Sequence, residues 1–123
     1  MLYSVILKNY TPIAEFSEEG EADFLEILTG LWKTNKQSVE FYVLPYQSYE
    51  FCFLQGQEYT FAGITRENTG ITYNKFLQDQ EKVLFFLQSL KKRFSEISSK
   101  ENLTFQSTLV LKELMVISSD VKI

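Results

Sequence analysis

Residues 50–65 of this 123-residue chain, EFCFLQGQEYTFAGIT, carry the pattern that decides the fold. Two apolar runs, 50–54 and 59–65, flank a short polar turn at 55–57, as in two strands joined by a tight connection. Both runs are apolar on both faces, and such a strand must be covered on both faces even in an antiparallel sheet. The stretch therefore predicts a sheet that lies between two layers of helices.

The rest of the chain supplies three further strands and three helices. Short apolar stretches predict strands at 2–8, 13–16 and 39–44, and the turn at 9–12 makes the first two a hairpin. Apolar residues at helical spacing predict helices over 21–34, 74–95 and 104–116, with a polar loop at 66–73.

These elements predict a single α/β (α+β) domain over residues 1–117, followed at 118–123 by a C-terminal tail or the start of a linker. The first helix carries the chain from the second strand to the far edge of the sheet. We therefore expect a five-stranded mixed sheet of order 2-1-5-4-3, with the strand at 39–44 on an edge.

Composition argues against most kinds of catalysis. The chain has no histidine and one cysteine, Cys52, which removes most routes to a zinc site or a histidine-activated nucleophile. It has no glycine-rich phosphate loop, and its net charge of −4 gives no attraction to nucleic acid. We therefore expect that the chain is not an enzyme and that it binds no cofactor, no metal and no nucleic acid.

Three clusters allow a chemical interpretation beside a structural one. The acidic residues within 18–21 are a candidate cation site or the favourable start of a helix, and Cys52 is a candidate nucleophile or an inert buried thiol. The basic run Lys91-Lys92-Arg93 is a candidate phosphate contact or a solvated helix end. The structural interpretation is favoured for each.

The sequence feature that favours a binding function is aromatic surface beyond what one core layer needs. Phe85 and Phe86 widen the apolar face of the long helix, while Trp32, Phe41 and Val43 fall on a helix and the neighbouring edge strand. The alternative is that these side chains fill a large core. Together, an edge strand and an aromatic helix favour protein binding, by strand addition or by docking of a helix in a groove.

Two stretches and the order of elements resemble a known family. LYSVILK at 2–8, followed by a short strand, and FLQSLKKRF at 86–94 are similar to the longin domain of R-SNAREs, the VAMP-like or synaptobrevin-like proteins of vesicle trafficking. The resemblance implies a profilin-like longin fold, with one helix on one face of the sheet and two on the other. It also implies regulatory binding of the protein's own SNARE motif in cis, or of SNARE, adaptor or coat proteins in trans.

In that family a groove between the first helix and the third strand is a main binding surface. Carried onto this sequence, the groove comprises Leu28, Leu31, Trp32, Val39, Phe41 and Val43. Replacing Trp32 or Phe41 by Asp is then expected to weaken binding in a domain that stays folded. The resemblance places the protein on the cytoplasmic face of endomembranes or transport vesicles, with any membrane anchor outside this chain and no insertion by this segment.

The sequence departs from the family in two places. The loop at 66–73 is longer than in typical members, and no SNARE heptad with a central arginine follows Ile123. We expect either an excised regulatory domain or a longin-like protein without a SNARE motif. Small subunits of coat-adaptor and tethering complexes share the fold and remain the alternative.

Overall fold

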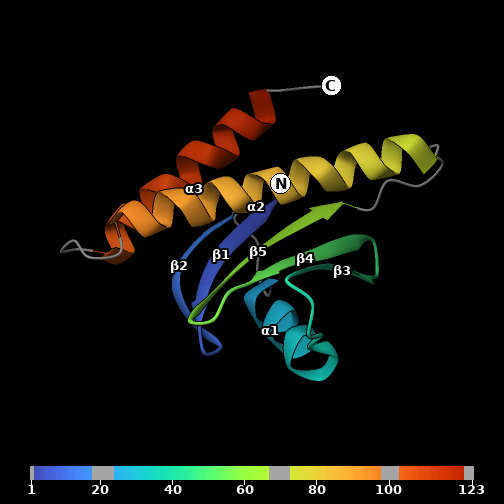
Figure 1. Cartoon of the computed structure of the whole chain (residues 1–123), viewed down its shortest axis with the longest axis horizontal. Coiled ribbons are helices and arrows are strands. Elements are labelled where there is room, and N and C mark those ends of the chain that lie inside the picture. The colour runs from blue at the N-terminus through green and yellow to red at the C-terminus, as the bar shows by residue number, and fades with distance from the viewer. Residues whose placement is uncertain (1, 18–23, 67–72, 98–102, 121–123) are drawn as a thin grey trace.

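The computed structural model describes residues 2–17, 24–66, 73–97 and 103–120. Its elements follow the predicted order, and the bounds are β1 (Tyr3–Lys8), β2 (Thr11–Ser17), α1 (Phe24–Asn35), β3 (Phe41–Tyr46), β4 (Tyr49–Gln55), β5 (Tyr59–Arg66), α2 (Tyr73–Ile97) and α3 (Leu103–Asp120). The five strands form one sheet of order β2-β1-β5-β4-β3 (Figure 1). The predicted α+β fold and strand order are confirmed.

The sheet is antiparallel at every described pairing, which corrects the expectation of a mixed sheet. Alternating direction across the order β2-β1-β5-β4-β3 gives β2 and β3 the same direction. The connection through α1 therefore joins two strands that run in the same direction, which requires a crossover rather than a tight turn. Because β2 and β3 lie at opposite edges of the sheet, they do not pair with each other.

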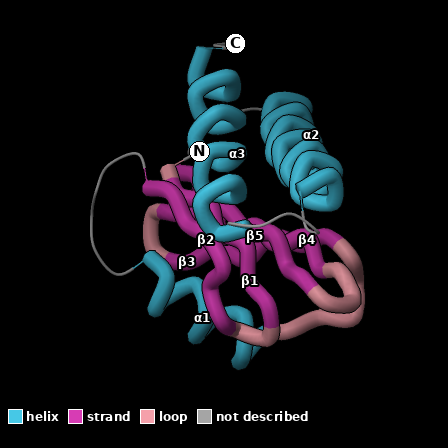
Figure 2. The backbone as a smooth tube through the Cα atoms, turned by 90° about the vertical axis from the view of Figure 1, so that its left-hand side faces the viewer, coloured by secondary structure: helices cyan, strands magenta, loops and turns pink. Residues whose placement is uncertain are grey.

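The helices form the two predicted layers (Figure 2). α1 packs on one face of the sheet, where Leu28 and Trp32 share a core with Phe51 and Phe53 of β4. α2 and α3 pack on the other face. Alternate residues of each strand point to opposite faces, so the apolar run at 51–54 feeds both cores at once.

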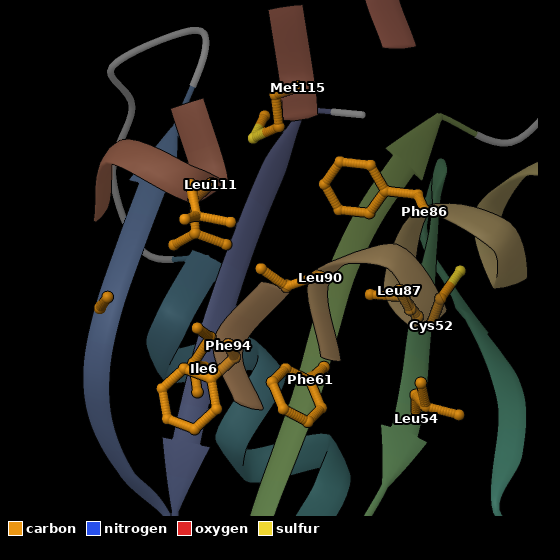
Figure 3. Close-up of a cluster of buried hydrophobic side chains, with 12 residues drawn as sticks. Ile6, Cys52, Leu54, Phe61, Phe86, Leu87, Leu90, Phe94, Leu111 and Met115 are labelled. Carbon is orange, nitrogen blue, oxygen red and sulfur yellow. The ribbon is translucent and has the colours of Figure 1, made fainter. Parts of the chain in front are cut away.

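The core beneath α2 and α3 is drawn in Figure 3. Strand residues Ile6, Cys52, Leu54 and Phe61 meet Phe86, Leu87, Leu90 and Phe94 of α2, with Leu111 and Met115 of α3. On β1, the Ser4 hydroxyl donates a hydrogen bond to the Met115 sulfur at 2.9 Å, which ties the strand to α3.

Element ends differ from expectation at the first hairpin, at β3, which runs over 41–46 rather than 39–44, and at α3. The first hairpin turn is only Asn9 and Tyr10, which have φ values of 50° and 68°, so β2 begins earlier than predicted. α3 continues to Asp120, so 118–120 extend the helix rather than starting a tail. The predicted acidic cluster at 18–21, most of the predicted loop at 66–73, and residues 121–123 lie outside the described residues. In the part of the chain that the structure describes, no helix is both long and apolar enough to cross a membrane.

Candidate functional site

α1 contributes three of the predicted groove residues, and two of them belong to the core. Leu28 is fully buried and Trp32 is 4% exposed, whereas Leu31 is half-buried at the rim of the same cluster. The Trp32 indole N–H donates to Oε1 of Gln55 at 2.9 Å, which attaches α1 to the end of β4. Leu28 and Trp32 therefore form the floor of this region and hold the fold.

Phe41 and Val43 lie on the opposite face of the sheet from α1. They pair with Leu54 and Cys52 of β4, and all four side chains pack in the core beneath α2 and α3. Tyr42 faces α1 instead.

Val39 precedes β3 and is 49% exposed. The structure therefore gathers the three α1 residues on one face and places Phe41 and Val43 on the other, so the six residues do not line a single groove.

A hollow of about 680 Å³ lies where α1 ends and where the β1–β2 and β4–β5 turns meet the segment before β3. Its wall combines Trp32, Val39 and Thr60 with charged and amide side chains. The carboxamides are those of Asn9, Gln37, Gln55 and Gln57. This wall offers hydrogen-bonding groups and apolar surface in similar measure.

Gln55 organises this end of the molecule. Its Oε1 accepts from Trp32, and its Nε2 donates to the carbonyls of Gln37 at 2.7 Å and Val39 at 2.8 Å. Its backbone N–H donates to the Glu40 carbonyl at 2.7 Å. One side chain thereby fixes the segment between α1 and β3 against β4.

Gly56, the next residue, makes the β4–β5 turn tight enough for this arrangement. Its N–H donates to the Tyr59 carbonyl at 2.9 Å. A Cβ added at position 56 would lie 2.8 Å from that same carbonyl oxygen. The turn therefore requires glycine because of close backbone approach.

Tyr10 covers the outer side of Trp32, with ring centroids 4.3 Å apart. The Lys36 ammonium lies 5.3 Å from the Trp32 centroid and 5.8 Å from the Tyr10 centroid, and that of Lys33 lies 5.1 Å from the Tyr10 ring. A bulky residue at φ 68° is strained, so these ring and cation contacts compensate the backbone cost.

Four charged residues at or beside the hollow form ion pairs on the surface. Lys91 lies 3.6 Å from Glu40, and Lys8 lies 3.2 Å from Glu58. The hydrogen bond to Glu58 raises the pKa of Lys8. Exposed pairs such as these contribute little stability, but they leave this wall with balanced charge.

The basic run on α2 is partly engaged within the domain. Arg93 makes an ion pair with Glu113 of α3 at 3.0 Å, and this pairing raises the pKa of Arg93 and lowers that of Glu113. With Lys91 paired to Glu40, two of the three basic residues join elements of the fold.

Burial shifts the pKa of two side chains, Cys52 and Tyr42. Cys52 is 1% exposed, and burial raises the pKa of its thiol to about 12, so the thiol is protonated at neutral pH. Burial also raises the pKa of Tyr42. Within the described residues the Tyr42 hydroxyl has no hydrogen-bond partner, and among them no three His, Cys, Asp or Glu side chains gather to hold a metal ion.

The sequence pattern did not predict that Gln55 fixes the segment before β3 or that Tyr10 packs on Trp32. A signal for Gln55 exists in the sequence, because 51, 53 and 55 share one face of a strand. That spacing places a carboxamide next to the buried aromatics of β4, on the side of the chain's single tryptophan. Tyr10 carries no comparable signal, since a hairpin turn with two positive φ values normally uses Asn and Gly.

No protein-family model matches the chain, and no curated protein sequence matches it.

Proposed function

We propose that this chain is a regulatory longin-type domain in vesicle-mediated transport, which binds its own SNARE motif or a sorting adaptor. The observation that carries the proposal is the architecture: a sheet of order β2-β1-β5-β4-β3, with α1 on one face and α2 and α3 on the other. These are the layers that the resemblance to R-SNARE longin domains implied.

The two stretches that carry the resemblance supply much of the core. Five of the six residues of β1 are buried, and in the stretch at 86–94 the residues Phe86, Leu87, Leu90 and Phe94 face the sheet. These stretches therefore support a shared fold. The case for binding depends on the surface beside β3.

On the α1 side of β3, the half-buried apolar residues are the candidates for partner contact. Ile27 and Leu31 of α1 and Leu44 of β3 pack at the margin of the same core, and Val39 stands exposed before the strand. A margin of this kind suits the apolar stripe of an amphipathic helix, such as a SNARE motif. The proposal places this contact on the cytoplasmic face of endomembranes or transport vesicles.

The test is a titration of the ¹⁵N-labelled domain with a synthetic R-SNARE-motif peptide, followed by amide NMR. We expect shifts around Leu31 and Leu44, and we expect Leu31→Asp to abolish them. Phe85→Asp, which also replaces apolar surface by charge but on α2, is the matched control. Absence of shifts with the peptide and with an adaptor fragment would exclude the proposal.

A second function is supported by one residue. Phe85 of α2 is 72% exposed, whereas its neighbour Phe86 is 5% exposed and faces the core. An aromatic side chain this exposed suits a permanent subunit interface, as in the small subunit of a coat-adaptor or tethering complex. A tagged chain purified from its source cells should then co-purify with a large subunit, and Phe85→Asp should release it. A strictly monomeric product would count against this alternative.

A further inference from the structure

The two edges of the sheet differ in how they are protected. On β2 the edge carries Pro12, its register with β1 shifts between Ile6 and Leu7, and α3 packs against the strand. Proline, irregular register and a covering helix are common ways to prevent further strand pairing. β3 has no charged residue between Phe41 and Tyr46, and its single breaker is Pro45 near the end.

The hydrogen bonds of β3 show which of its backbone groups point outward. The bond from the Gln55 N–H to the Glu40 carbonyl marks 40 and 55 as a hydrogen-bonded pair. Because such pairs alternate along an antiparallel ladder, Tyr42 and Leu44 direct their backbone groups to β4, and Phe41, Val43 and Pro45 direct theirs away. Proline has no N–H, so the outward donors of the strand are those of Phe41 and Val43.

We propose that β3 pairs with β3 of a second copy of this chain, antiparallel, about a twofold axis at Tyr42. In this register Phe41 of each copy lies opposite Val43 of the other. The N–H of each donates to the carbonyl of the other, which makes four hydrogen bonds and uses every outward donor of both strands. The two sheets then form one continuous ten-stranded sheet with an isologous interface.

The side chains fit this register. Phe41 and Val43 meet across the interface on the α2 face, and an aromatic residue opposite a β-branched one is a favourable cross-strand pair. On the α1 face Tyr42 meets its own copy, and Glu40 lies opposite Leu44. No two like charges face each other within the paired segment.

The mutual pairing of Phe41 with Val43 favours a second copy, and Pro45 selects this one register. A twofold axis at Val43 would place Phe41 opposite Pro45 of the other copy, and its carbonyl would find no donor. The axis at Tyr42 keeps both prolines outside the paired segment. The inference rests on the β3 edge alone, so its outcome is independent of the proposed role in trafficking.

The test combines sedimentation equilibrium with hydrogen exchange of the whole chain over a range of concentrations. We expect a reversible dimer in which the amides of Phe41 and Val43 gain protection as concentration rises. The amides of Tyr42 and Leu44, already bonded to β4, should change little.

Two variants decide whether the β3 edge forms the dimer. Val43→Pro removes two of the four hydrogen bonds and leaves the bonds to β4 in place, so the dissociation constant should rise about thirty-fold. Val43→Lys should raise the dissociation constant as well, whereas Thr11→Lys, the same charge on the β2 edge, should leave it unchanged. Circular dichroism confirms that each variant is folded.

Three results would overturn the proposal. One is a chain that stays monomeric up to millimolar concentration. Another is a dimer that survives both Val43 variants in folded protein. The last is protection of Phe41 and Val43 by a synthetic peptide of foreign sequence without self-association, which would assign the edge to a different partner.

Discussion

Gln55→Ala tests how much of the stability at the turn end depends on one side chain. The substitution removes three hydrogen bonds, from the Trp32 indole and to the carbonyls of Gln37 and Val39. A typical hydrogen bond contributes about 0.5–1.5 kcal/mol net. The bond with Trp32 is partly buried and counts at the upper end, while the two exposed bonds count at the lower end. We therefore expect the free energy of unfolding to fall by about 2 kcal/mol.

Urea unfolding followed by tryptophan fluorescence measures this loss directly, because Trp32 is the single tryptophan. With a urea slope of about 2 kcal/mol/M, the unfolding midpoint should fall by about 1 M. Native emission should also change, since the indole N–H loses its acceptor.

Two variants sharpen the measurement. Gln57→Ala removes an exposed carboxamide from the same turn and should leave the free energy of unfolding within about 0.5 kcal/mol of the parent value. Gln55→Glu keeps the acceptor for Trp32 but sets a carboxylate oxygen against the carbonyls of Gln37 and Val39, so we expect it to destabilise at least as much as Gln55→Ala. If Gln55→Ala unfolds at the parent midpoint, or if Gln57→Ala is equally harmful, the organising role of Gln55 is wrong.

Three further predictions follow from the turns and the core. Gly56→Ala should lower the free energy of unfolding by about 1–3 kcal/mol, because the new Cβ meets backbone at 2.8 Å. Gly30→Ala in α1 has open space and should raise it by about 0.5–1 kcal/mol. Equal changes in melting temperature for the two variants would contradict this. Burial raises the pKa of Cys52 to about 12 from its usual 9.0, so the unfolded chain loses this proton first as the pH rises. The free energy of unfolding should therefore decline above pH 9, and less steeply in Cys52→Ala. The same pH dependence of stability in both proteins would count against this role of burial. Tyr10→Ala should lose the indole contact at a cost of about 1–2 kcal/mol, and Tyr10→Gly should recover about 1 kcal/mol by relieving the positive φ; a glycine variant less stable than the alanine variant would refute the strain argument.

Strand order was predictable from the connections between elements. α1 carries the chain from β2 to the far edge of the sheet, and short turns then bring β3, β4 and β5 back in sequence to β1. Helix faces followed from spacing, since Leu87, Leu90 and Phe94 are buried as their periodicity indicates.

The faces of β3 were not predictable from sequence. Its first four residues, Phe41 to Leu44, are all apolar, so alternation gives no sign of which pair faces α1. The register with β4 settles it, because Phe41 pairs with Leu54 and Val43 with Cys52. A shift of one residue exchanges the two faces, and this is why the expected groove joined residues from opposite sides of the sheet.

The same register limits where a partner can bind. α1 covers one face of the sheet and α2 with α3 cover the other, so the strands offer little open face within the described residues. Binding must then use the outer surfaces of helices or a strand edge. Of the two edges, β2 is protected by Pro12 and α3, while β3 presents the outward donors of Phe41 and Val43. If β3 pairs with a second copy, a partner that docks on the α1 margin at Leu31 and Leu44 must bind beside that interface. Dimerisation and partner binding would then compete or cooperate according to how far the partner reaches toward β3.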